Sequence, residues 1–244
     1  MIETTVDLAT ADGAMPTFIT HPEAGGPHPA VILYMDAPGM REELRDFARR
    51  MATVGYYVLL PNLYYRDGGP TFPPAAERSD EDSKRMFALM DALTNARILE
   101  DTQPMVAHAE ADPAASAGSM GCIGYCMSGQ YVLTVAGTHP ERFKAMASLH
   151  GVRMLTDAED SPHKLIPSLQ GEQYFGFAEE DPHVPREEVD KIKGVLAEAG
   201  ANALVEVHPG TEHGFVFPAR QVFNKAEAER NWERVFAMFR RQLG

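Results

Sequence analysis

One cysteine lies in a sequence context that fits a nucleophile. Residues 124–129 read Gly-Tyr-Cys-Met-Ser-Gly, which places Cys126 at the junction of a predicted buried strand and a helix. This string fits a nucleophile elbow, in which small residues flank the nucleophile because the turn is too tight for large side chains. The N-terminus of the following helix stabilises a thiolate, and its N–H groups can hold an oxyanion. A buried structural cysteine is the alternative interpretation.

Two serines compete with Cys126 as the nucleophile. Ser128 is followed two residues later by Gln130, which is too large for the elbow pattern. Ser119 lies in a matching string at 117–121, but this string precedes the predicted strand. The sequence therefore favours Cys126.

An acid and a base follow later predicted strands. Asp181 comes after the strand at 173–178, and His213 comes after the strand at 203–208. Hydrolases with an elbow carry the nucleophile, acid and histidine in this chain order, on loops at the carboxyl ends of the strands. We therefore predict a catalytic triad of Cys126, Asp181 and His213.

Alternatives exist for two members of this triad. Glu179 and Glu180 compete for the role of the acid, and Asp181 could instead be a turn residue before the next helix. His213 could be a solvated loop histidine. His208 is its closest rival, but it lies inside the strand pattern, where it cannot easily reach over the edge of the sheet.

A second turn can complete an oxyanion hole. Residues 34–39 follow the first buried strand, and the corresponding turn of such hydrolases supplies an N–H, here that of Ala37, to pair with Met127. Asp36 would then face the nucleophile. An acid near the N-terminus of the next helix, close to Arg41, is an equally good interpretation of Asp36.

Strands and helices alternate along the chain, which predicts an α/β fold. Continuous apolar runs indicate strands buried on both faces of a mostly parallel sheet. The turn at Asp12 and Gly13 indicates an N-terminal antiparallel hairpin. No segment reads as a linker, so we predict one doubly wound domain over 1–244, with helices on both faces. The strands are expected at 4–9, 15–20, 30–35, 56–60, 119–125, 145–149, 173–178 and 203–208, and the last helix at 219–243 with Val222 buried.

Composition narrows the classes of function. The 244 residues carry 35 acidic and 22 basic side chains, a net charge of -13, which disfavours nucleic acid as a partner. No apolar run is long enough for a membrane helix, and residues 1–13 lack a signal-peptide pattern. Two cysteines provide no disulfide framework, so a cytoplasmic location is expected. His183, His208 and His213 lack the spacing of a metal site, and we expect neither a metal nor a cofactor.

The chain resembles the dienelactone hydrolase (carboxymethylenebutenolidase) family, which has an α/β-hydrolase fold and a Cys-His-Asp triad. The match runs over nearly the whole chain, and the elbow with cysteine is its most specific element. The matching segments are residues 55–64 with Arg66, residues 123–129, Phe175 and Gly176, residues 181–185, and residues 213–215.

This resemblance implies hydrolysis of a cyclic enol ester. Cys126 would attack the lactone carbonyl, and His213 would act as the general base, oriented by Asp181. The family usually has Glu at the position of Asp36, where the acid is implicated in controlling protonation of the resting thiol. Asp is one methylene shorter, and this departure puts the thiol switch in question.

Residues around the site bear on the substrate. Dienelactone-specific members of the family bind the substrate carboxylate with arginines, one of them four residues after the catalytic histidine, where this chain has Phe217. Arg78 and Arg85 are candidates for the other arginine, although a solvated helix face also explains them. Tyr64 and Tyr65, with Phe72, are candidate apolar walls of the site. His150 follows the strand at 145–149, where a structural role is favoured over pocket lining.

Three functions follow in order of preference. The first is hydrolysis of a small lactone or ester through a thioester acyl-enzyme. The second keeps the triad but acts on another carboxylic ester or a thioester, because Phe217 replaces the expected arginine. The third is a non-catalytic scaffold that binds a ligand or a partner.

Overall fold

A computed structural model describes all residues, 1–244. The chain forms two compact units, Met1–Met120 and Gly121–Gly244, and each is described by itself. The single domain expected over 1–244 stays a prediction.

The first unit contains four paired strands. They are β1 (Ile2–Thr10), β2 (Gly13–His21), β3 (His28–Tyr34) and β4 (Tyr57–Pro61), in the spatial order β1-β2-β4-β3. β1 and β2 form the predicted antiparallel hairpin, and β3 pairs with β4 in parallel. β4 is buried along its whole length, as its continuous apolar sequence predicts, whereas most of β1 is exposed.

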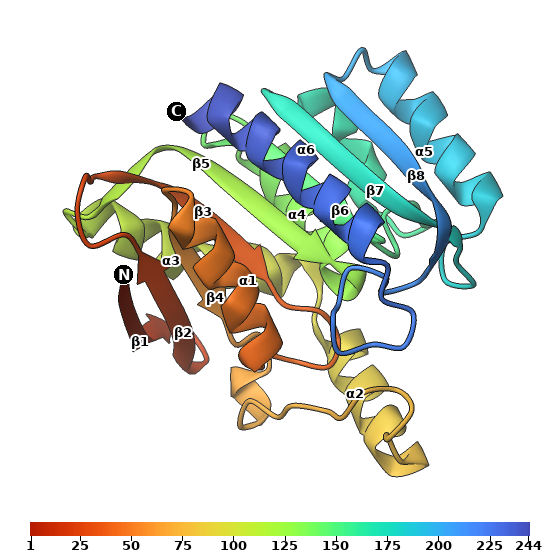
Figure 1. The fold of residues 1–244 in the computed structure, drawn as a ribbon, viewed down its shortest axis with the longest axis horizontal. Helices are drawn as coiled ribbons and strands as arrows, with labels where there is room; N and C mark the ends of the chain where they lie inside the picture. The colour runs from red at the N-terminus through yellow and green to blue at the C-terminus, as the bar shows by residue number, and fades with distance from the viewer. The chain divides into compact units, whose positions relative to one another are not determined.

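Three α-helices complete the first unit (Figure 1). They are α1 (Glu42–Thr53), α2 (Asp80–Ala92) and α3 (Asn95–Ala111), and a short 3-10 helix, η1 (Tyr65–Asp67), lies in the long loop. α1 buries Leu44, Phe47 and Met51 against β2 and β4, because these residues recur at helical spacing. Gly55 follows α1 with a φ of 109°, a left-handed conformation that favours glycine.

The second unit holds the remaining strands. They are β5 (Ala115–Tyr125), which begins in the first unit, β6 (Phe143–Leu149), β7 (Glu172–Glu180) and β8 (Ala203–Glu212), in the spatial order β5-β6-β7-β8. β6, β7 and β8 pair in parallel, so their carboxyl ends share one edge. The predicted α/β class with a mostly parallel sheet is thus confirmed.

Helices cover these strands. They are α4 (Gly129–Thr138), α5 (Arg186–Glu198) and α6 (Lys225–Leu243), with the 3-10 helices η2 (Cys126–Ser128) and η3 (Pro162–Ser168). α6 packs along β6 and β7, in front of them in Figure 1, while α4 packs against β6 and η3. The apolar face of α6, which includes Trp232, Phe236 and Phe239, is buried.

Three sequence-based boundaries were wrong. β5 begins at Ala115, four residues before its predicted start, so the whole string at 117–121 lies inside this strand. β8 continues to Glu212, four residues beyond its predicted end. α6 begins at Lys225 because the side chain of Asn224 caps it by accepting a hydrogen bond from the backbone N–H of Glu227, and Val222 is half-buried outside the helix.

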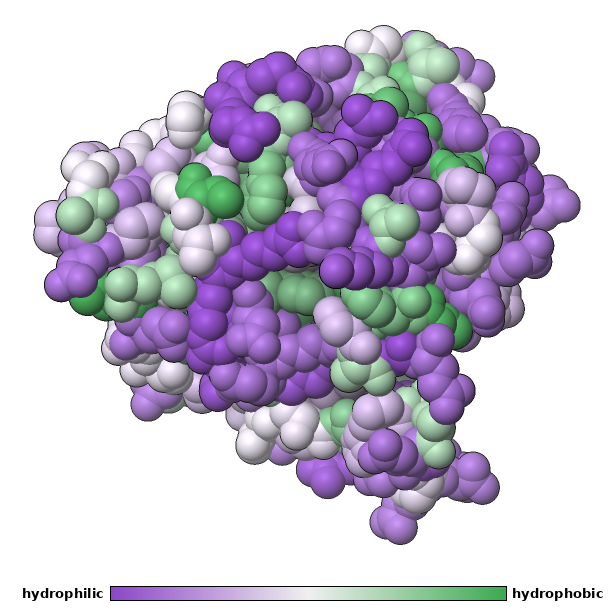
Figure 2. Space-filling view, in the orientation of Figure 1, coloured by the Kyte–Doolittle hydropathy of each residue, from purple (hydrophilic) through white to green (hydrophobic).

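None of the helices is both long and apolar enough to cross a membrane. Figure 2 shows hydrophilic side chains over most of the face in view, with apolar side chains in small groups. This surface agrees with the acidic composition of the chain.

Candidate active site

Cys126 occupies a strained turn between β5 and α4. Its φ of 52° lies in the left-handed region, which non-glycine residues rarely adopt. A Cβ atom at Gly124 would lie 2.5 Å from the carbonyl oxygen of Ser128, so the turn requires glycine at this position. The geometry is that of the predicted elbow, and it leaves the Cys126 side chain partly exposed. The other cysteine, Cys122, is fully buried.

The loop after β6 is attached to this elbow. The backbone N–H of Val152 donates a hydrogen bond to the carbonyl oxygen of Cys126 at 3.0 Å. Gly129 and Gly151 approach so closely that a Cβ atom on either would overlap the other residue. Glycine at both positions therefore allows the residues after β6 to pack directly on the turn that carries Cys126.

The register of β7 and β8 brings Asp181 and His213 together. Glu180 pairs with Glu212, and Asp181 and His213 are the next residues of each strand. Nδ1 of His213 lies 2.7 Å from Oδ2 of Asp181, and Oδ1 of Asp181 accepts the backbone N–H of His183 at 2.9 Å. Because both carboxylate oxygens are engaged, the orientation of the Asp181 side chain is fixed.

Cys126 and Asp181 determine the charge of His213. Burial lowers the pKa of His213, but the charge of Cys126 and the hydrogen bond to Asp181 outweigh it and raise this pKa to about 10. The Nε2 atom is buried and makes no hydrogen bond of ordinary geometry, so Cys126 acts on it mainly as a nearby charge. The arrangement therefore favours the imidazolium form of His213.

The rival residues are engaged elsewhere. The carboxylate of Glu179 accepts the backbone N–H of Gly210 at 2.8 Å, and Glu180 is exposed at the end of β7. His208 lies inside β8, as its sequence position predicts. Its Nδ1 lies 2.7 Å from Glu227 and its Nε2 lies 3.0 Å from the hydroxyl of Tyr174. Among Glu179, Glu180 and Asp181, only Asp181 pairs with His213.

Two further histidines flank the ring of His213. The rings of His150 and His183 each lie 4.8 Å from it, centroid to centroid, in edge-to-face geometry. His150 is fully buried, whereas His183 is exposed. The three residues follow the parallel strands β6, β7 and β8, whose carboxyl ends share one edge, but the contacts between their rings could not be read from the sequence.

Phe217 is buried next to this group of rings. It lies 5.4 Å from Tyr125 and 5.8 Å from His150, measured between ring centroids. The guanidinium of Arg220 lies 4.2 Å from the centre of the Phe217 ring, and its charge acts on His150. No pattern in the sequence pointed to Arg220, which places a cation beside Phe217 although position 217 is aromatic.

Asp36 and Ala37 lie in the first unit, in the turn after β3. The buried carboxylate of Asp36 forms an ion pair with Arg41, the residue that precedes α1. The carbonyl oxygen of Ala37 accepts the hydroxyl of Tyr64 at 2.9 Å, and that of Pro38 accepts the N–H of Phe72 at 2.9 Å. The pairing of Ala37 with Met127 and the approach of Asp36 to Cys126 stay predictions.

The other candidate substrate-binding residues of the first unit have local partners or are exposed. The hydroxyl of Tyr65 is hydrogen-bonded to Thr10 at 2.8 Å and to Asp101 at 2.9 Å, which favours a structural role. Arg78 donates to the carbonyl oxygen of Pro73, and Arg85 is exposed on α2. These contacts do not reveal a carboxylate-binding arginine in this unit.

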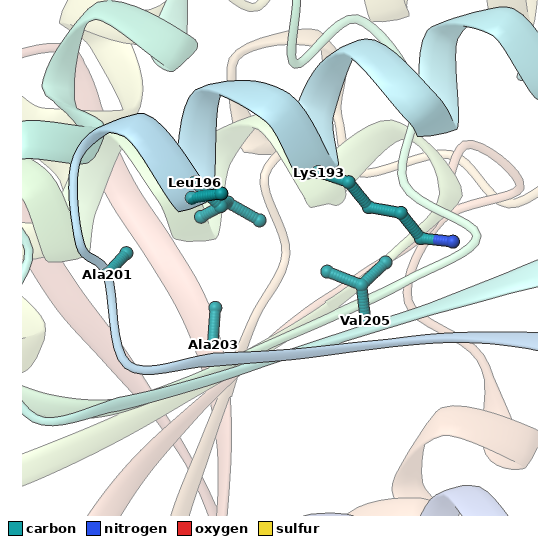
Figure 3. Close-up of a pocket in the computed structure, with 6 residues that line it drawn as sticks. Lys193, Leu196, Ala201, Ala203 and Val205 are labelled. Atoms are coloured by element: carbon teal, nitrogen blue, oxygen red, sulfur yellow. The ribbon is translucent and has the colours of Figure 1, made fainter.

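A surface pocket is lined by other residues than these. It occupies about 390 Å³ between α5 and β8, and Figure 3 shows Lys193 above Val205 at one end and Leu196 near Ala201 at the other. Its lining contains no cysteine, serine, acid or histidine.

Comparisons with known proteins find relatives over nearly the whole chain. A protein from Synechocystis named "Putative carboxymethylenebutenolidase" is 27% identical over 98% of this chain and 99% of its own length. A protein of the same name from Escherichia coli K12 is 26% identical over 94% of this chain and 83% of its own.

Solved structures share the fold. That of a "Putative Dienelactone Hydrolase" from Klebsiella pneumoniae has a TM-score of 0.86 and 24% identity, covering 98% of each chain. A dienelactone hydrolase-like promiscuous phosphotriesterase from metagenomic libraries has a TM-score of 0.80 and 20% identity, covering 100% of this chain and 99% of its own. These likenesses confirm the predicted α/β-hydrolase fold. Because the Dienelactone hydrolase family profile matches residues 15–243, this chain belongs to the dienelactone hydrolase family.

Proposed function

We propose that this protein hydrolyses a small lactone or ester through a triad of Cys126, His213 and Asp181. The observation that carries the proposal is the 2.7 Å contact between Nδ1 of His213 and Asp181, next to a cysteine whose charge raises the pKa of His213. Relatives named carboxymethylenebutenolidase support the same class of reaction.

The first half of the reaction forms a thioester. The Cys126 thiolate attacks the carbonyl carbon, and the carbonyl oxygen becomes an oxyanion. When the tetrahedral intermediate collapses, the bond to the alcohol oxygen breaks, and the imidazolium of His213 gives its proton to that oxygen. Asp181 holds the ring so that Nε2 faces the reacting atoms.

The second half hydrolyses the thioester. Neutral His213 takes a proton from water as the water oxygen attacks the thioester carbon. The carbon–sulfur bond then breaks, and the thiolate leaves beside the imidazolium, which restores the resting ion pair. No external oxidant or reductant takes part, and the products are a carboxylic acid and an alcohol, joined in one molecule when the substrate is a lactone.

The elbow also supplies an oxyanion donor. The backbone N–H of Met127 follows Cys126 directly, at the start of η2 and ahead of α4. Such a donor stabilises charge that develops in the transition state. We assign this role to Met127, and the second donor predicted at Ala37 completes the proposal.

Two classes of substrate fit the neighbourhood of His213. The buried ring of Phe217 favours an uncharged ester, whereas Arg220, stacked on that ring, favours a substrate that carries a carboxylate. Rates for dienelactone, a neutral lactone and p-nitrophenyl acetate separate these classes. Fast turnover of dienelactone alone supports the anionic class, and turnover of only the uncharged substrates supports the neutral class.

Three variants test the triad with the same substrates. Cys126→Ala and His213→Ala should abolish turnover, while Cys122→Ala, which alters the buried cysteine, should retain it in folded protein. Full activity of either triad variant would refute the proposal. If the wild type turns over no substrate, and iodoacetamide modifies Cys126 no faster than a free thiol, a non-catalytic binding scaffold becomes the better explanation.

A further inference from the structure

His150 is a buried polar residue that the proposed reaction does not use. Its side chain is fully buried, and neither Nδ1 nor Nε2 has a hydrogen-bond partner. The adjacent Nε2 of His213 is also buried and makes no hydrogen bond of ordinary geometry, although Cys126 lies close enough to act on it. The two unsatisfied nitrogens of His150 thus lie on a ring whose centroid is 4.8 Å from that of the His213 ring. Buried polar groups without partners are rare in folded proteins, and each needs an explanation.

The backbone of His150 is strained as well. Its φ is 38°, in the left-handed region that a residue with a Cβ atom rarely adopts. Its N–H donates a hydrogen bond to the carbonyl oxygen of Gly176 at 2.6 Å. Two residues later, the N–H of Val152 donates a hydrogen bond to the carbonyl oxygen of Cys126. Strain of this kind persists where the surrounding structure enforces it, and it concentrates at functional sites.

The surroundings hold the His150 ring in place without satisfying it. The rings of Tyr125, Phe215 and Phe217 lie about it with centroid distances of 6.1, 6.1 and 5.8 Å. An apolar ring of similar size would fill this space without the desolvation cost of two nitrogens. The use of histidine here therefore points to a polar group that reaches the ring during the reaction.

Burial and the neighbouring charges keep His150 neutral. Burial, followed by the charges of His213 and Arg220, lowers the pKa of His150 well below its ordinary value. A neutral imidazole has one N–H donor and one acceptor nitrogen. It can therefore donate a hydrogen bond to an alcohol oxygen, or accept a hydrogen bond from water, without gaining or losing a proton itself.

Burial does not argue against contact with the reacting atoms. Nε2 of His213, the atom that must meet the substrate in the proposed reaction, is as inaccessible in this structure as the nitrogens of His150. Any movement that admits an oxygen to His213 therefore occurs next to the ring of His150. Phe215, Phe217 and Arg220 belong to the same loop as His213 and move with it if that loop shifts.

We propose that His150 hydrogen-bonds the oxygen on which His213 acts. This inference rests on the proposed function. During acylation that oxygen belongs to the leaving alcohol, and it takes its proton from His213. During hydrolysis of the thioester it belongs to water, which gives a proton to His213 as its oxygen bonds to the acyl carbon and the carbon–sulfur bond breaks. His150 aligns this oxygen in both halves and remains neutral throughout.

His183 provides a matched control. Its ring lies at the same 4.8 Å from His213, but it is exposed and has no buried, unpartnered nitrogen. The substitution His183→Phe keeps the backbone N–H that binds Asp181. It removes an imidazole at the same centroid distance from the same ring, so it reports the effect of losing any neighbouring imidazole.

The experiment separates the two halves of the reaction. p-Nitrophenyl acetate has a good leaving group that needs little protonation, so its hydrolysis depends chiefly on water attacking the acetyl-enzyme. Stopped-flow absorbance and quenched-flow mass spectrometry measure acylation and deacylation for the wild type, His150→Phe and His183→Phe. We expect His150→Phe to slow deacylation about tenfold or more, from loss of a hydrogen bond to a reacting atom, and to change acylation much less.

Further variants guard against misfolding and test the chemistry. His150→Asn restores a donor and an acceptor and should recover part of the deacylation rate. His150→Met, a second variant without nitrogens, replaces His150→Phe if circular dichroism shows that the latter is unfolded. Hydroxylamine attacks thioesters more readily than water does, so it should raise the turnover of His150→Phe by a larger factor than that of the wild type.

The outcomes are distinct. Equal slowing of both steps in His150→Phe, no slowing of either, or the same slowing in His183→Phe would overturn the role of His150. None of these results touches the triad. If the wild type forms no acetyl-enzyme on Cys126, the proposed function fails instead, and the role of His150 fails with it.

Discussion

Two histidines of the second unit, five residues apart, are alike in the contact of Nδ1 and differ in the contact of Nε2. His208 and His213 each place Nδ1 2.7 Å from a carboxylate, that of Glu227 and that of Asp181, respectively. His208 also binds the hydroxyl of Tyr174 through Nε2 at 3.0 Å, so both of its nitrogens are satisfied. Nε2 of His213 has no such partner.

The difference follows from position on the strand. His208 lies within β8, where its neighbours are parts of the packed interior, while His213 is the first residue beyond the strand. A histidine–carboxylate pair alone therefore does not identify a catalytic base. The unsatisfied second nitrogen, at the carboxyl edge of the sheet and beside a nucleophile, distinguishes the reactive pair from the structural one.

Replacement of the two histidines gives the sharpest contrast. His213→Ala should lower kcat for p-nitrophenyl acetate about 10³-fold or more, because it removes both the general base and the cation beside Cys126. His208→Phe should keep most of the kcat of the wild type. Steady-state kinetics on folded protein measure both. Comparable losses in the two variants would break the distinction between the sites.

Replacement of the two acids should give the next largest difference. Asp181→Asn preserves shape but no longer favours the correct tautomer of His213, so kcat should fall about 10²- to 10⁴-fold. Glu227→Gln changes the partner of His208 in the same way, and kcat should stay near the wild-type value. An inactive but folded Glu227→Gln would show that the network around His208 serves the reaction.

The structural pair should reveal itself in stability. His208→Phe fills the same space but leaves the hydroxyl of Tyr174 and the carboxylate of Glu227 with fewer partners. The free energy of unfolding should fall by about 1–3 kcal/mol, measured by urea denaturation. Unchanged stability would mean that the contacts of His208 contribute no net stabilisation.

The reactive pair should reveal itself in the pKa of His213. Removal of the negative charge in Cys126→Ser leaves the effect of burial, which lowers this pKa, opposed only by Asp181. The pKa should therefore fall below the value of about 10 found beside Cys126. NMR titration of the His213 ring nitrogens in both proteins measures the change. An equal pKa in the two proteins would show that Cys126 carries no charge at rest.

Much of this arrangement was predictable from local sequence. The buried strands follow from continuous apolar runs, and the elbow follows from Gly124 and Cys126 at a strand end. The prediction that Asp181 and His213 share one edge rests on the parallel order of their strands, which β7 and β8 confirm. Periodicity and turn chemistry carry this information because they act over a few residues.

The remainder depends on contacts between distant residues. The extra residues of β8 and the late start of α6 result from pairing with β7 and from the cap at Asn224. The sequence already favours Asp181 as the acid, but the contact that engages Glu179 with the backbone N–H of Gly210 appears only in the structure. The unpartnered nitrogens of His150 are likewise a property of packing, which the residue types alone do not specify.

Identification of the acylated residue tests directly whether Cys126 is the nucleophile. The wild type and Cys122→Ala are mixed with p-nitrophenyl acetate, quenched in acid, digested and analysed by mass spectrometry. We predict one acetyl group in both proteins, on the side chain of Cys126 and on no other. It should form and disappear at rates that account for turnover. Turnover without acetylation of Cys126, or acetylation of Cys122 instead, would contradict the assignment of Cys126 as the nucleophile.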